Sequence, residues 1–155
     1  MQARMKSPAL NLPGAMEAIF QIAKATEGCG VPLATLELVH ARVAQLNGCS
    51  VCLDMHTRRL EKLAESKTRI FALAAWREAS YYTEAERAAL ALAEAATRLS
   101  DRADAVSDDV WKEASRHFNE TELGALVMSI ALANLWNRLN VATRQVSGDW
   151  VAQYI

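Results

Sequence analysis

The sequence has few of the residues that interrupt helices. Only six glycines and three prolines occur among its 155 residues, which disfavours an architecture of many short strands and turns. Its longest nearly apolar run, residues 123–133, falls short of the roughly 20 apolar residues that a membrane span needs. The first residues also lack the apolar segment of a signal peptide, so we expect a cytoplasmic protein with no membrane partner.

An excess of charge of one sign is also missing. The net charge is −1, and basic and acidic side chains are interleaved, so the chain has no basic face and we expect no nucleic-acid partner. Three cysteines are an odd number for a protein in a reducing compartment. A disulfide scaffold is therefore not expected, and a close pair of cysteines points to catalysis or metal binding.

What the sequence does contain is a series of amphipathic helical segments. We predict a single all-α domain over residues 1–155 with no strand and no internal repeat, in which residues 77–82 form an extended connection. Thr83 with Glu86, and Asn119 with Glu122, have the spacing of N-terminal capping boxes. The predicted helices lie between Pro13 and Gly28, and over residues 32–47, 49–65, 68–76, 84–99, 107–117 and 119–146.

Two cysteines and a histidine share one predicted helix in the segment LNGCSVCLDMH. With Asn47 as the helix cap, Cys49, Cys52 and His56 lie within about 60° of one another around the helix axis. His56 follows Cys52 by four residues, so its ring is expected to lean over the sulfur. A first-turn position and a neighbouring imidazole both lower the pKa of a thiol, and a second thiol three residues away can condense with a sulfenic acid.

Glu37 is expected to meet His56 across a hairpin. Glu37 lies about 15 Å before the Asn47–Gly48 break and His56 about 13.5 Å beyond it, at a rise of about 1.5 Å per residue, so the two residues are level. A carboxylate beside the imidazole would hold its tautomer and raise its basicity. We therefore predict a relay from Glu37 through His56 to Cys52, with Cys49 as the resolving cysteine, and we favour Cys52 over Cys49 as the attacking thiol.

These residues resemble the core of the alkylhydroperoxidase D family within the carboxymuconolactone decarboxylase superfamily. The segment RVAQLNGCSVCLDMH is close to the peroxidase-related branch, and NLWNRLNVATR (residues 134–144) resembles the last helix of that branch. The resemblance implies a bundle of about six to seven helices with its core at about 33–146. It also implies peroxide reduction by the two cysteines, an external dithiol reductant, no metal or other cofactor, and a homo-oligomer (dimer, trimer or hexamer). Val51 stands where well-studied members have a second histidine, which implies a simpler proton relay.

Other interpretations remain open at this point. The cysteines can be ordinary packing residues, or they can join His56 with His40 or Glu37 in the four-ligand set that zinc requires. His40 is a candidate for the lining of the site. The chain can also be a carboxymuconolactone decarboxylase-like enzyme or a non-catalytic helical oligomer. The amides of Asn134, Asn137 and Asn140 need partners, which we expect from an oligomer contact.

Overall fold

The computed structural model describes residues 2–101 and 103–155. Within these ranges it contains eight α-helices, three 3₁₀-helices and no strand, so the predicted all-α fold is confirmed. The elements are α1 (Pro8–Asn11), α2 (Ala15–Thr26), α3 (Leu33–Asn47), α4 (Ser50–Lys62), α5 (Lys67–Ala72), η1 (Leu73–Ala75), α6 (Glu84–Thr97), η2 (Leu99–Asp101), α7 (Asp108–His117), α8 (Glu120–Ala142) and η3 (Asp149–Tyr154).

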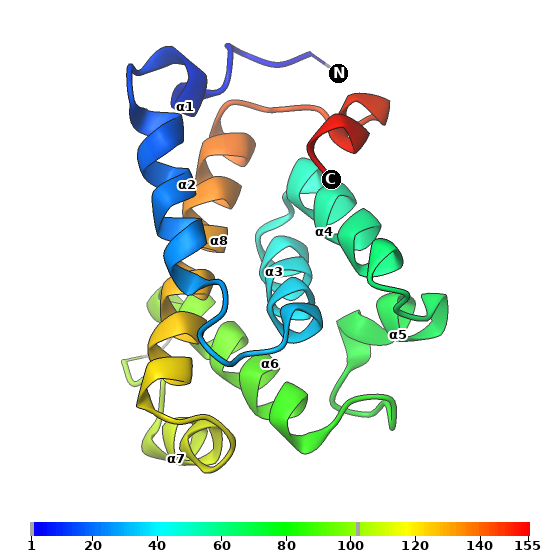
Figure 1. Cartoon of the computed structure of the whole chain (residues 1–155), viewed down its shortest axis with the longest axis vertical. Coiled ribbons are helices and arrows are strands. Elements are labelled where there is room, and N and C mark those ends of the chain that lie inside the picture. The colour runs from blue at the N-terminus through cyan, green and yellow to red at the C-terminus, as the bar shows by residue number, and fades with distance from the viewer. Residues whose placement is uncertain (1, 102) are drawn as a thin grey trace.

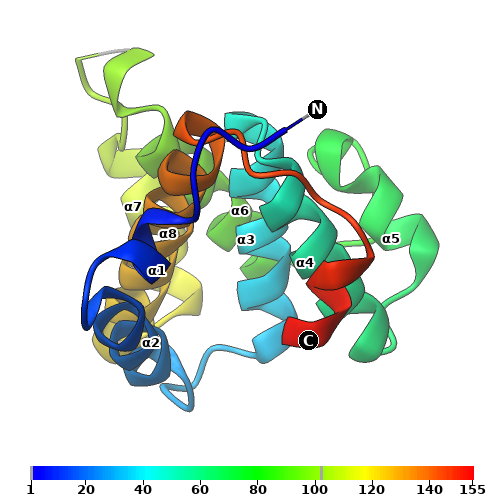
Figure 2. The ribbon, with the colours of Figure 1, turned by 90° about the horizontal axis from the view of Figure 1, so that it is seen from above.

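Helix α3 is the central element of the bundle. It packs against α4, α6 and α8, while α2 lies along α8 on the outside (Figure 1). The view from above shows α3 enclosed between α8 on one side and α4 on the other (Figure 2). This arrangement brings the residues of α3, α4 and α8 together at the point where α3 turns into α4.

Local signals begin and end these helices. The predicted capping boxes are present at the start of α6 and of α8, where the cap side chain and the third helical residue bond each other's backbone. Gly48 ends α3 in the left-handed region, with φ of +67°, which glycine adopts without steric cost. The chain can therefore reverse within two residues and start α4.

Three predicted segments differ from the structure. The last long helix ends at Ala142 instead of about Val146, and Arg144 follows with a positive φ of 54°. The single helix predicted over residues 68–76 is α5 followed by the 3₁₀-helix η1. Residues 77–82 form turns instead of an extended connection, because Arg87 donates hydrogen bonds to the carbonyls of Trp76, Arg77 and Ala79 and draws the chain round its guanidinium group.

The apolar core follows the same arrangement of helices. One cluster lies between α3, α6, α7 and α8, and a second packs α3 against α4, α5 and η1. A third, smaller cluster contains Cys49, Val51 and Cys52 together with Val151 of η3. Within the part of the chain that is described, no helix combines the length and the hydropathy that crossing a membrane requires.

Candidate dithiol site

Cys49 and Cys52 lie at the N-terminus of α4 and are joined by a disulfide. Their Cα atoms are 5.4 Å apart, and the residues are only 2% and 4% exposed. Cys49 is itself the N-cap, and its sulfur accepts the backbone N–H of Cys52 at 3.3 Å. The prediction that Asn47 caps this helix is wrong, because Gly48 ends α3 after Asn47 and leaves Cys49 in an extended conformation. Cys52, and not Cys49, therefore occupies the first turn.

Glu37 and His56 meet across the α3–α4 hairpin, as the spacing predicts. His56 Nδ1 lies 2.6 Å from Glu37 Oε2, and the two side chains are 13% and 5% exposed. Burial raises the pKa of the Glu37 carboxyl, but the hydrogen bond and charge of His56, together with Arg59, outweigh burial and lower it. Arg59 Nη1 lies 3.4 Å from the other carboxylate oxygen. The carboxylate is therefore ionised at neutral pH and can hold the proton of His56 on Nδ1.

His40 lies beside this pair. Its ring centroid is 4.7 Å from that of His56, and its Nε2 lies 2.6 Å from Ser129 Oγ on α8. Burial and the nearby His56 lower the pKa of His40 to about 3, so its imidazole is neutral at physiological pH. The structure thus places His40 against the Glu37–His56 pair, and a role in lining the site stays a prediction.

Glu37, His40 and His56 are also the residues that could hold a metal ion. Each offers one ligand atom, and these atoms lie within 4.8 Å of one another. The guanidinium of Arg59 lies against the same carboxylate, however, and would repel a cation. Glu37 and Ser129 already bond one nitrogen of each histidine. The arrangement therefore suits the transfer of a proton better than the coordination of a metal.

The sulfur of Cys52 has a partner that the sequence did not reveal. Asn140 Nδ2, in the last turn of α8, donates to Cys52 Sγ at 3.3 Å. His56 was expected to lean over this sulfur, yet among the described residues its hydrogen bond is to Glu37 and its Nε2 has no partner. Asn140 is 88 residues from Cys52 in the chain, so no local spacing pattern could have paired them.

The other amides of α8 are also bonded inside the subunit. Asn47 Nδ2, at the end of α3, donates to Asn134 Oδ1 at 3.0 Å and to Asn137 Oδ1 at 2.9 Å. Asn134 in turn donates to Thr97 Oγ1 on α6. The expectation that an oligomer contact supplies these partners is wrong, because Asn47 of α3, Thr97 of α6 and Cys52 of α4 supply them within the subunit.

The segment η3 covers the cysteines. Val151 is fully buried in the apolar cluster that contains Cys49 and Cys52, and η3 lies against α4, as its red ribbon shows in Figure 1. Polar contacts from α4 hold the segment, since Arg59 Nη2 donates to the carbonyl of Tyr154 and Lys62 Nζ to that of Ile155. The disulfide is therefore shielded by a short segment with few contacts elsewhere.

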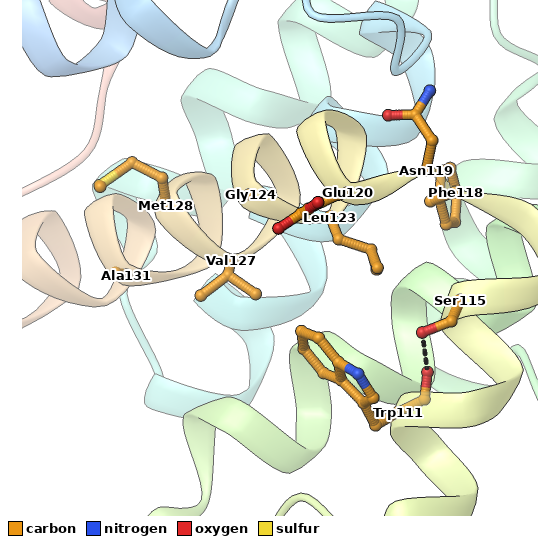
Figure 3. A pocket seen from close by; sticks show the side chains of 10 residues that line it. All are labelled: Trp111, Ser115, Phe118, Asn119, Glu120, Leu123, Gly124, Val127, Met128 and Ala131. Carbon is orange, nitrogen blue, oxygen red and sulfur yellow. Dashed lines mark hydrogen bonds between the residues drawn. The ribbon is translucent and has the colours of Figure 1, made fainter.

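A separate surface hollow of about 800 Å³ lies at the other end of α8. Figure 3 shows Trp111 of α7 facing Leu123 and Val127 of α8 across it. Trp111 and Met128 are 44% and 48% exposed here, whereas Trp76 is buried. This hollow contains neither cysteine nor histidine and is not part of the dithiol site.

The sequence profile of the carboxymuconolactone decarboxylase family matches residues 13–95, which include Glu37, both cysteines of the pair and His56. The chain is 35% identical over 130 residues to the uncharacterized protein YdfG of Bacillus subtilis strain 168, covering 84% of this chain and 87% of that one.

Two solved structures share the fold. A protein of unknown function from Agrobacterium tumefaciens, for which an AhpD antioxidant defence role has been suggested, superposes with a TM-score of 0.87 at 28% identity over 95% of this chain and 99% of that one. An uncharacterized peroxidase-related protein with the alkylhydroperoxidase AhpD core, from Ralstonia eutropha JMP134, gives a TM-score of 0.78 at 18% identity over 92% and 75%. The fold is thus AhpD-like, and the chain belongs to the carboxymuconolactone decarboxylase family.

Proposed function

We propose that this protein is a thiol-dependent peroxidase that reduces organic hydroperoxides or hydrogen peroxide through a cycle of the Cys49–Cys52 pair. The observation that carries the proposal is a disulfide at the N-terminus of α4, followed one helical turn later by His56, whose imidazole is paired with the buried Glu37 carboxylate. A helix N-terminus stabilises a thiolate, and a base that can accept and return a proton completes the requirements of the reaction.

The chemistry runs in three steps. The Cys52 thiolate attacks the peroxide, the O–O bond breaks, and the sulfur becomes a sulfenic acid while the leaving oxygen takes a proton and departs as alcohol or water. The Cys49 thiol attacks that sulfur, forming the disulfide and releasing water. An external dithiol then reduces the disulfide and is itself oxidised to a disulfide.

In this scheme the protein supplies the protons. His56 takes the thiol proton of Cys52 and returns it to the leaving oxygen, and the Glu37 carboxylate keeps Nδ1 protonated so that Nε2 is the basic atom. His56 itself, with a smaller contribution from Arg59, lowers the pKa of the Glu37 carboxyl and so keeps it ionised. We propose further that the protein acts in the cytoplasm as a homo-oligomer, and no metal enters the scheme.

Steady-state turnover of hydrogen peroxide and of an organic hydroperoxide, with a small dithiol as reductant, tests the proposal. Cys52→Ser and Cys49→Ser should each abolish turnover, whereas Cys29→Ser should leave it unchanged, because Cys29 is the free cysteine and lies in the separate α2–α3 connection. Equal turnover in the wild type and in Cys52→Ser would contradict the proposal.

A lactone decarboxylase is the second candidate. The observation that favours it is the match to a family named for that activity, over a range that includes Glu37 and His56. Such a reaction needs an acid and a base but no paired thiols. Replacing both Cys49 and Cys52 by Ser separates the two functions, because a decarboxylase would keep its activity and a dithiol peroxidase would lose it.

A further inference from the structure

We infer that Asn140 is a further catalytic residue, whose side-chain N–H stabilises the thiolate of Cys52 and so makes Cys52, and not Cys49, the attacking cysteine. Only the catalytic consequence of this inference depends on the proposed dithiol chemistry. The hydrogen bond itself and its effect on the thiol can be tested without any peroxide.

The contact is a direct one to the reacting atom. Asn140 Nδ2 donates to Cys52 Sγ at 3.3 Å, within the range of a bond to sulfur. Cys52 is only 4% exposed, so little water can solvate a charge on its sulfur, and an unsolvated buried charge is costly. A donor held against the sulfur supplies part of the stabilisation that water would otherwise give.

The position of α8, which carries the amide, is fixed by two other asparagines of the same helix. Asn137 and Asn134, about one and two turns before Asn140, both accept hydrogen bonds from Asn47. Asn47 is the last residue of α3, two positions before Cys49. The bonds that fix α8 therefore also fix the start of the cysteine segment, which sets the distance between the amide and the sulfur in advance.

The two sulfurs differ in the donors that they receive. Cys49 Sγ accepts the backbone N–H of Cys52 within the same helical turn, and Cys52 Sγ accepts the amide of α8. Replacing Asn140 removes the donor of one sulfur and leaves that of the other. A specific effect of Asn140 should therefore change the pKa of the Cys52 thiol alone, whereas a general loss of structure would change the pKa of both thiols.

The experiment follows the ultraviolet absorbance of the thiolate with pH in two reduced proteins. One carries Cys49→Ser and Cys29→Ser, so that only Cys52 titrates, and the other carries Cys52→Ser and Cys29→Ser, so that only Cys49 titrates. In the first protein, Asn140→Leu should move the midpoint to higher pH. Alkylation of Cys52 by iodoacetamide at neutral pH should fall by about threefold to tenfold, because the smaller thiolate fraction is partly offset by the greater nucleophilicity of a more basic thiolate.

In the second protein the same substitution should leave the titration of Cys49 unchanged. Val141→Ala, at an exposed neighbouring position, serves as a control and should move neither midpoint. Asn140→Asp keeps the shape of the side chain but places an anion at the sulfur, so it should move the midpoint of Cys52 further than Asn140→Leu does. The inference is overturned if Asn140→Leu leaves the Cys52 midpoint in place, or if it moves both midpoints equally.

Discussion

The chemistry of the site depends on which protons its residues carry. Glu37 is buried, yet its contacts with His56 and Arg59 keep it ionised, and His40 is neutral because burial and the nearby His56 lower its pKa. One imidazole is thus paired with a carboxylate and the other is not. This difference is the reason why we propose His56, and not His40, for the transfer of protons.

Replacing Glu37 by Gln tests the assignment of His56. The amide keeps the shape of the carboxylate but loses its charge, so in the proposed relay His56 would be a weaker base toward Cys52. We expect the rate of reaction of the reduced protein with peroxide to fall by at least about tenfold, measured by stopped-flow consumption of thiols. Glu61→Gln, at an exposed position on α4, is the control and should react like the wild type, and a wild-type rate in Glu37→Gln would exclude the relay.

His40 makes a prediction about stability and pH. Its pKa is about 3 in the folded state against an ordinary value of 6.5, so between these values the unfolded chain binds more protons and stability falls as the pH falls. The neighbouring ionisable groups are His56, Glu37 and Arg59. Because the pKa of Glu37 is lowered, its own contribution is present above its ordinary value of 4.5 and is lost below it.

His40→Gln isolates this effect, since Gln can still bond Ser129 but cannot titrate. Urea unfolding between pH 7 and pH 5 should show a steeper loss of stability in the wild type than in the variant. If the free energy of unfolding falls equally with pH in the two proteins, His40 is accessible to protons in the folded state.

At the scale of the elements, the site is a junction of α3, α4 and α8, covered by η3. The helices and their capping boxes could be predicted from local spacing, and so could the meeting of Glu37 with His56, because a hairpin with a known rise fixes which residues are level. Asn140 could not, since its pairing with Cys52 depends on how α8 packs. The N-cap at Cys49 was missed because cysteine is not a usual cap, and η3 was missed because it lacks a capping signal and is positioned by tertiary contacts of Val151 with the cysteine cluster.

The position of η3 predicts that it limits access to the disulfide. Removing residues 148–155 takes away Val151, so we expect reduction of the Cys49–Cys52 disulfide by a water-soluble phosphine to become several-fold faster, as measured by thiol release. Tyr154→Ala removes an exposed side chain and should leave the rate near that of the wild type. If truncation is without effect while circular dichroism shows a folded protein, η3 does not shield the site.

At the scale of the whole molecule, the AhpD-like fold places the buried dithiol site and the surface hollow at opposite ends of α8. The dithiol site lies near Asn140, and the hollow near Leu123 and Trp111 is lined by neither cysteine nor histidine (Figure 3). The homo-oligomer that the family resemblance implies stays a prediction. The internal bonding of Asn134 and Asn137 removes one reason for expecting a partner at those residues.

The central claim is that two neighbouring thiols of one chain are oxidised together by peroxide. The most direct measurement is the mass of the reduced protein after one equivalent of hydrogen peroxide, followed by mapping of the peptide that contains Cys49 and Cys52. We predict a loss of about two mass units confined to that peptide, because two thiols become one disulfide. An unchanged mass, or a stable gain of oxygen on one sulfur while the other stays a thiol, would contradict the dithiol mechanism.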